Sequence, residues 1–294
     1  MGNYSIKELE KLSGIKAHTI RIWEKRHSII EPARTNTNIR YYSDEDLKKI
    51  LNVSILNNHG FKISRIASLT RDNLVESVKR LSEEKTDTGI YIDQLTLSMI
   101  DFDEAKFEKL LAGYILKLGF ERTLLEVVYP FLTKIGVLWL SNHISPIQEH
   151  FITNLIRQKI VVAIDGITKK PAENAKKVVF FLPESEMHEI GLLFFHYLLK
   201  NMGFQTYYLG QYVPLADLEK SVERLRPDYM VASISYSPSQ KQLNKFLAEL
   251  NERFKSINIY ITGRPVLEKG FSGHSNLFFF KDAAALKDTF SNIG

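Results

Sequence analysis

The hydrophobic positions of this chain follow two different spacings, and the change between them divides the sequence. Up to about residue 170, apolar side chains recur three or four residues apart, which is the spacing of amphipathic helices. From about residue 175, short runs of β-branched and aromatic residues alternate with helical segments, which is typical of a parallel α/β sheet. We therefore expect a helical first part and an α/β second part.

The start of the chain predicts a helix-turn-helix followed by a β-hairpin. Ser5 and Glu8 form a capping pattern for a helix that ends at Gly14, and a second helix is expected over residues 17–25. Two extended pieces around an Asn/Thr-rich tip predict the hairpin. Further helices are expected near 43–50 and 55–66, with a break at residue 60, and the polar residues after them predict a linker.

The rest of the chain predicts a helix bundle and then a five-stranded parallel sheet. Four apolar stripes at helical spacing lie between residues 90 and 167. Strands are expected near 178–183, 205–209, 229–233, 258–262 and 277–280, with helices between and after them, in the flavodoxin-like order. The predicted fold class is multidomain α and α/β: a winged helix-turn-helix at 1–75, a linker at 76–90, a four-helix bundle at 91–170 and an α/β domain at 175–294.

Composition excludes several kinds of site. The chain has 294 residues and no cysteine, which excludes disulfides, thiolate metal sites and cysteine nucleophiles. No apolar run approaches the roughly 18 residues of a membrane span, and no leader-like pattern opens the chain. We expect a cytoplasmic protein with no membrane partner.

Positive charge is concentrated in the first quarter of the sequence. Residues 1–80 hold 15 Lys and Arg against 9 Asp and Glu, whereas the remaining residues hold 24 against 25. A basic excess confined to one segment indicates a nucleic-acid partner for that segment. A solvated basic face is the alternative.

Two motifs in this basic segment resemble the winged helix-turn-helix of MerR-type transcription regulators. They are the Arg-x-Trp-Glu-x-Arg run that begins at Arg21, and Arg40-Tyr41-Tyr42-Ser43 with the Asp-Leu pair that follows. The resemblance implies dimers that bind inverted repeats in double-stranded DNA. Trp23 is expected to pack rather than to contact DNA, and the side chains expected at DNA are Thr19, Arg21, Arg26, Arg34, Arg40 and Tyr41.

A second motif, Glu186-x-His188-x-x-Gly191, stands where a strand gives way to a helix. That end of a parallel sheet is where ligands bind, although a lone histidine here is often only a surface residue. The spacing resembles the ExHxxG form of the cobalamin-binding motif DxHxxG. The resemblance implies that His188 is the lower cobalt ligand, that Glu186 holds its other ring nitrogen, and that Gly191 admits the macrocycle.

Further along, two residues match the borders of the slot for the cobalamin nucleotide tail in that family. They are Ser233 at the end of the third strand and Gly263 after the fourth. The family has a second glycine where this chain has Arg264, which either obstructs the tail or pairs with its phosphate.

A third motif lies in the predicted bundle, where Trp139 precedes Glu149 and His150. This spacing resembles the helical cap of CarH-type light-sensing regulators, which depend on adenosylcobalamin. The resemblance implies that Trp139 covers the upper axial group, with Glu149 near it, and that His150 ligates cobalt after light cleaves the cobalt–carbon bond. The alternative is a buried Trp139 and a helix that merely begins at Pro146.

These observations favour a transcription regulator, switched by adenosylcobalamin and light through a change between homo-oligomers such as dimer and tetramer. The alternative keeps the DNA-binding role but makes the second half a protein-interaction module without cofactor, which Arg264 favours. A corrinoid methyl-transfer module fits poorly, since the N-terminal segment predicts a DNA reader and no catalytic methyltransferase domain accompanies it. Outside these motifs we find no nucleophile–base pair, so we expect no enzyme.

Overall fold

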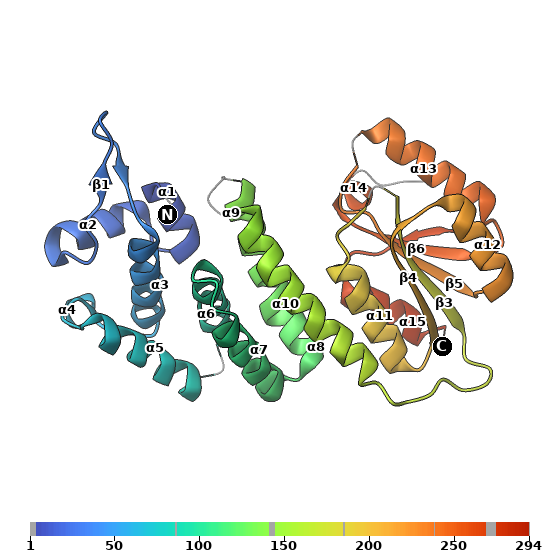
Figure 1. The fold of residues 1–294 in the computed structure, drawn as a ribbon, viewed down its shortest axis with the longest axis horizontal. Helices are drawn as coiled ribbons and strands as arrows, with labels where there is room; N and C mark the ends of the chain where they lie inside the picture. The colour runs from blue at the N-terminus through green and yellow to red at the C-terminus, as the bar shows by residue number, and fades with distance from the viewer. Residues whose placement is uncertain are drawn as a thin grey trace. The chain divides into compact units, whose positions relative to one another are not determined.

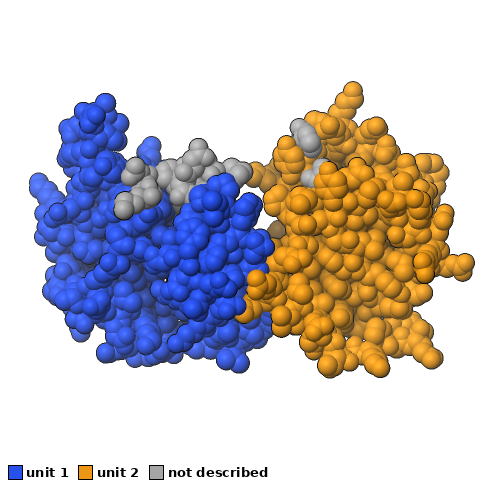
Figure 2. Space-filling model, in the orientation of Figure 1, with its two compact units in different colours: residues 1–155 blue, residues 156–294 orange. Residues whose placement is uncertain are grey.

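The computed structural model describes residues 4–85, 87–140, 145–184, 186–237, 239–268 and 275–293, apart from the side chains of 137–140. They form two compact units, residues 1–155 and 156–294, shown in Figure 2. The division falls within one helix, α10, so it differs from the predicted four-part division, which stays a prediction.

The helix-turn-helix and the hairpin form as predicted. Ser5 caps the first helix together with Glu8, and Gly14 ends it in a left-handed conformation. The elements are α1 (Ile6–Ser13), α2 (Ala17–His27), β1 (Ala33–Arg34), β2 (Arg40–Tyr41), α3 (Asp44–Asn58) and α4 (Ile63–Ala67). The third helix is longer than expected because its apolar spacing continues from Leu47 to Leu56 without a break.

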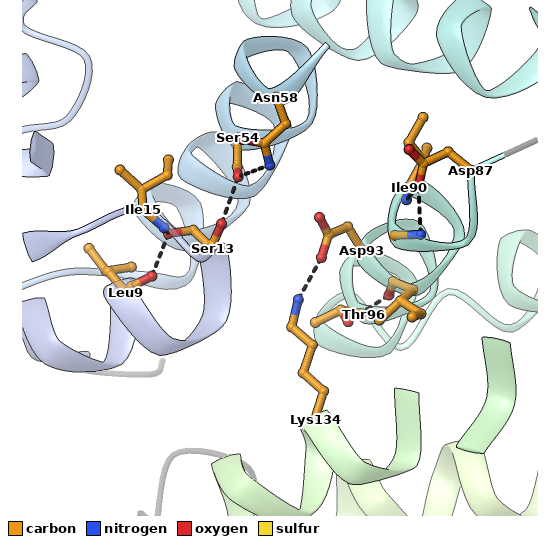
Figure 3. Close-up of polar contacts among 12 residues, drawn as sticks. Leu9, Ser13, Ile15, Ser54, Asn58, Asp87, Ile90, Asp93, Thr96 and Lys134 are labelled. Atoms are coloured by element: carbon orange, nitrogen blue, oxygen red, sulfur yellow. Dashed lines mark hydrogen bonds and ion pairs between the residues drawn. The ribbon is translucent and has the colours of Figure 1, made fainter. Parts of the chain in front are cut away.

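A chain of hydrogen bonds fixes α1 against α3, as Figure 3 shows. The Ser54 hydroxyl donates to the Ser13 carbonyl at 2.6 Å, and Asn58 donates to the Ser54 oxygen at 3.3 Å. The Ser13 hydroxyl in turn donates to the Leu9 carbonyl at 2.6 Å. Because Ser13 and Ser54 are buried, these bonds satisfy polar groups that water does not reach.

The predicted linker at 76–90 is wrong for most of its length. Residues Arg71–Glu84 form the helix α5, capped by Thr70, and α6 begins at Thr88. The polar composition suggested a linker, but the segment is amphipathic: Leu74, Val78 and Leu81 are buried on one face of the helix.

The predicted bundle forms from helices that continue this first unit. They are α6 (Thr88–Ile100), α7 (Glu104–Leu118), α8 (Phe120–Thr123), the π-helical turn η1 (Leu124–Val128), α9 (Tyr129–Leu140) and α10 (Pro146–Asp165). In η1 the Tyr129 amide donates to the Leu124 carbonyl, five residues earlier, so a wide turn joins α8 to α9. A partly buried ion pair with a 2.5 Å separation joins Asp93 of α6 to Lys134 of α9 (Figure 3).

The second unit contains the parallel sheet. Within the described part of the chain, five strands lie in the order β4-β3-β5-β6-β7, as the flavodoxin-like prediction requires (Figure 1). The elements are β3 (Lys177–Pro183), α11 (Ile190–Met202), β4 (Gln205–Val213), α12 (Leu215–Leu225), β5 (Tyr229–Ser233), α13 (Gln240–Arg253), β6 (Asn258–Thr262), α14 (Arg264–Leu267), β7 (Leu277–Phe279) and α15 (Ala283–Ser291).

The interior strand β3 is buried on both faces. Phe181 belongs to the core that includes residues of α12 and α13, whereas Phe180 contacts His196 of α11 on the other face. Burying a side chain of this size contributes roughly 2–3 kcal/mol. This packing holds the carboxyl end of β3 in place. The motif that begins at Glu186 comes shortly after that end of the strand. No described helix is both long and apolar enough to span a membrane.

Candidate functional site

Glu186 and His188 lie together at the carboxyl end of β3. The Glu186 carboxylate is almost fully buried, whereas the His188 side chain is 72% exposed. Glu186 Oε1 accepts from the His188 amide at 2.9 Å and lies 2.6 Å from His188 Nδ1. Because a carboxylate oxygen only accepts, Nδ1 carries the proton, and a metal bound to this ring would use Nε2.

Ser235, which the sequence analysis missed, completes this arrangement. Its amide and hydroxyl donate to Glu186 Oε2 at 2.5 and 2.7 Å, and its oxygen lies 3.0 Å from His188 Nδ1. Burial alone would raise the pKa of Glu186, but the bonds from His188 and Ser235 outweigh it and lower that pKa to about 2. The order of the strands could have indicated Ser235, because this residue follows β5 and β5 pairs with β3.

Exposed apolar side chains lie at the same edge of the sheet as His188. Met187, Tyr212 and Tyr236 are each more than half exposed, at the carboxyl ends of β3, β4 and β5. Hydrogen bonds place them here, because Gln211 donates to the Met187 carbonyl and the Tyr236 amide donates to Glu186. Exposed apolar groups around a polar anchor are typical of a ligand site.

Gly191 is not required by the packing of the protein itself. A Cβ built there would come no nearer than 4.0 Å to a neighbouring atom, the ring of Phe195. A glycine near the start of α11 costs about 0.5–1 kcal/mol relative to alanine. Its presence therefore fits close approach by a ligand, as the motif implies.

Ser233 and Gly263 end adjacent strands, β5 and β6. Ser233 is buried, and Gly263 has a φ of +125° at a position where a Cβ would lie 1.9 Å from the Ile234 carbonyl oxygen. Arg264 points into solvent, where its Nε donates to Glu268 at 2.6 Å with 80% of the side chain exposed. Of the two alternatives for Arg264, this outward orientation agrees with the one in which the guanidinium does not obstruct the tail.

The upper-face motif is described only in part. Trp139 belongs to α9, but its side chain lies outside the described residues. Glu149 and His150 are in the first turns of α10, and the Glu149 carboxylate lies 3.1 Å from His150 Nδ1. The His150 side chain is 71% exposed. Ser145 caps the start of this helix as the alternative interpretation predicted.

The residues predicted to contact DNA lie on α2 and the hairpin. Arg21 and Arg26 are exposed on α2, and neither forms a hydrogen bond or ion pair with a described residue. Thr19 lies on the same helix and is half-buried, whereas Trp23 is 8% exposed and packs as expected. The second helix can therefore present two cations to a partner.

On the hairpin, both arginines also make internal contacts. Arg34 donates to Asn38 across the tip at 2.6 Å, and Tyr41 pairs with Ala33 through the backbone. Arg40 Nε donates to Glu24 of α2 at 3.3 Å. Arg40 thus ties the hairpin to α2, a role that its sequence context did not reveal.

Two family models match this chain. The MerR HTH family regulatory protein model matches residues 4–73, and the B12 binding domain model matches residues 91–163. The chain is 26% identical over 271 residues to the HTH-type transcriptional repressor CarH of Myxococcus xanthus, a match that covers 88% of each chain. The chain is thus a CarH-like transcriptional regulator with a MerR-type HTH segment and a B12-binding domain.

A second relative and one solved structure are also similar to this chain. The regulator is 26% identical over 236 residues to the HTH-type transcriptional repressor CarA of Myxococcus xanthus, covering 78% of this chain and 75% of that one. In fold it is similar to the monomethylamine corrinoid protein of Methanosarcina barkeri, with a TM-score of 0.57 and 16% identity. That match covers 71% of the regulator and 100% of the corrinoid protein. The similarity to transcriptional repressors indicates a regulator rather than an enzyme.

Proposed function

We propose that this regulator binds adenosylcobalamin and that the cofactor, through light, controls its assembly and its affinity for DNA. The observation that carries the proposal is the exposed His188 ring, whose Nδ1 is held at 2.6 Å by the buried Glu186 carboxylate. A second-shell carboxylate of this kind fixes the tautomer and raises the basicity of a metal-binding imidazole.

The surroundings of His188 fit a large, partly apolar ligand. Met187, Tyr212 and Tyr236 offer exposed apolar surface, and Gly191 leaves room beside them. We assign Ser233 and Gly263 to the nucleotide tail. Arg264 favoured the alternative, a module without cofactor, but its side chain is exposed and pairs with Glu268, which supports the cofactor-binding proposal.

We assign Trp139, Glu149 and His150 to the upper side of the cofactor, as the CarH-type resemblance implies. When bound, adenosylcobalamin supplies a cobalt–carbon bond that light cleaves. A ligand shifts an assembly equilibrium only through different contacts in the two states. We propose that Trp139 makes such a contact in the dark and that His150 ligates cobalt after illumination.

The direct test is an absorbance spectrum with a gel-filtration profile. We expect the purified protein, incubated with adenosylcobalamin in the dark and desalted, to retain the corrinoid spectrum, and green light to change its elution volume. A His188→Ala variant should retain much less corrinoid. A wild-type protein without corrinoid absorbance would refute cofactor binding, whereas retained corrinoid with an unchanged elution volume would refute only the light-driven assembly.

For the DNA-binding half, we expect Arg40→Ala to weaken binding to all sequences. Loss of one phosphate contact flattens the slope of log affinity against log salt by about one unit. Fluorescence anisotropy at several salt concentrations, with specific and unrelated duplexes, measures both effects. Arg80→Ala is the control, since Arg80 is exposed on α5 and forms an exposed pair with Glu76. An Arg40→Ala effect confined to one base pair would contradict the phosphate role.

A further inference from the structure

A second buried carboxylate lies directly beside His188. Glu189 is only 9% exposed, and each of its oxygens has its own partner. Oε1 accepts from Arg157 Nε at 2.5 Å, and Oε2 accepts from the Tyr208 hydroxyl at 2.9 Å. A buried carboxylate needs such partners because its desolvation is otherwise costly.

The partners of Glu189 come from two other elements of the second unit. Arg157 belongs to α10 and Tyr208 to β4. The Tyr208 ring stacks on His196 of α11, with centroids 5.3 Å apart, and His196 Nε2 lies 2.9 Å from Thr206 Oγ1 on β4. The segment that carries His188 is thus connected to α10 on one side and to the edge of the sheet on the other.

Glu189 is also connected to His188 through the backbone. It is the residue before α11, and its carbonyl accepts from the Leu193 amide at 2.8 Å, so its backbone belongs to the first turn of that helix. His188 is joined to it by one peptide bond. A displacement of the Glu189 backbone therefore affects both the first turn of α11 and the position of His188.

Arg157 also lies on the same helix, α10, as His150. It follows His150 by seven residues in the same helix, and seven residues are close to two full turns, so both side chains leave the same face about 10 Å apart. Two of the proposed upper-face residues, Glu149 and His150, thus share one helix with Arg157, the partner of the His188 segment.

We infer that Arg157, Glu189 and Tyr208 form a positioning network that holds the His188 segment against α10 and couples ligation at His188 to the position of that helix. The inference rests on the proposed function, since it names how cofactor binding at His188 reaches the bundle. Arg157 and Tyr208 act through Glu189 and are positioning residues.

The test replaces the guanidinium and measures the His188 segment with and without cofactor. In the cofactor-free full-length protein, we expect Arg157→Met to raise hydrogen–deuterium exchange of the peptide over residues 186–193 about tenfold, as for loss of one charge-assisted bond at a half-exposed side chain. With adenosylcobalamin, we expect about tenfold weaker binding and a spectrum shifted from imidazole-ligated cobalt toward cobalt without that ligand. Arg157→Lys should restore both in part, since it keeps the charge but not the guanidinium geometry.

Arg253→Met is the matched control. Arg253 lies in the same unit and is 40% exposed against 47% for Arg157, and its partner Glu219 is also exposed, so neither readout should change. If Arg157→Met does not fold, Tyr208→Phe removes a single hydroxyl and should give smaller changes of the same kind.

The outcomes separate the network from the proposed function. If the wild-type protein retains no corrinoid, the proposed function fails and the coupling fails with it, while the exchange readout still tests whether the network positions the segment. If the wild-type protein binds corrinoid and Arg157→Met behaves like Arg253→Met, the network is refuted. Faster exchange with an unchanged ligation spectrum would overturn the coupling to His188.

Discussion

Replacing Gly263 with alanine is expected to lower the free energy of unfolding of the α/β unit by about 3–5 kcal/mol. A Cβ at this position would lie 1.9 Å from the Ile234 carbonyl oxygen and 2.5 Å from its carbon, both backbone atoms of the neighbouring segment. The φ of +125° adds conformational strain for any residue with a side chain. Strain and overpacking each cost about 1–3 kcal/mol.

Urea denaturation of the full chain, followed by circular dichroism, measures this loss. Gly191→Ala is the matched control in the same unit, because its nearest contact of 4.0 Å is an ordinary one. We expect its stability to be unchanged or up to about 1 kcal/mol higher, while its affinity for adenosylcobalamin falls. Equal stability losses in both variants would contradict the packing argument, and a Gly191→Ala protein with full cofactor affinity would contradict the role of Gly191.

The second large effect is expected from Glu186→Gln and depends on pH. The pKa of Glu186 falls from 4.5 to about 2 on folding, so the carboxylate stabilises the fold above pH 4.5 and this stability is lost as the pH falls toward 2. The shift corresponds to on the order of 3 kcal/mol. Glutamine cannot replace it, because both carboxylate oxygens accept hydrogen bonds and an amide nitrogen only donates.

We therefore expect Glu186→Gln to be less stable than the wild type at pH 7 and the difference to shrink as the pH falls to 3. Chemical denaturation at a series of pH values measures this. Glu252→Gln is the control, since Glu252 forms an exposed pair with Lys255. At neutral pH we also expect corrinoid affinity of Glu186→Gln to fall about 10–100-fold. A stability difference that is constant with pH would refute the assignment of the shift to Glu186.

Much of the fold could be predicted because local sequence and tertiary packing agree. The run from Val178 to Leu182 is buried on both faces, which is what a continuous apolar segment indicates in a parallel sheet. Likewise, the Ser5 capping pattern and Gly14 marked both ends of the first helix. The helix α5 was missed because its polar composition outweighed the spacing of its three buried apolar residues.

The site could be predicted only where its residues follow one another in the sequence. Glu186 and His188 are two positions apart, so their spacing alone indicated a carboxylate–imidazole pair. Ser235 lies 49 residues from its partner Glu186 in the sequence, and Arg157 lies 32 residues from its partner Glu189. Neither has a local motif, and only the order of the strands and the path of α10 bring them to these partners.

The π-helical turn η1 has a consequence for the sidedness of the bundle. A turn of this kind contains one residue more than an α-helical turn, and each residue of a helix advances about 100° around its axis. If the same residues formed a regular α-helical turn instead, Tyr129–Leu140 would be rotated by about that angle relative to α8, while the length and apolar character of the helix hardly changed. The face that α9 turns toward the other helices of the bundle is thus set by the winding of this one turn as well as by the sequence of α9 itself.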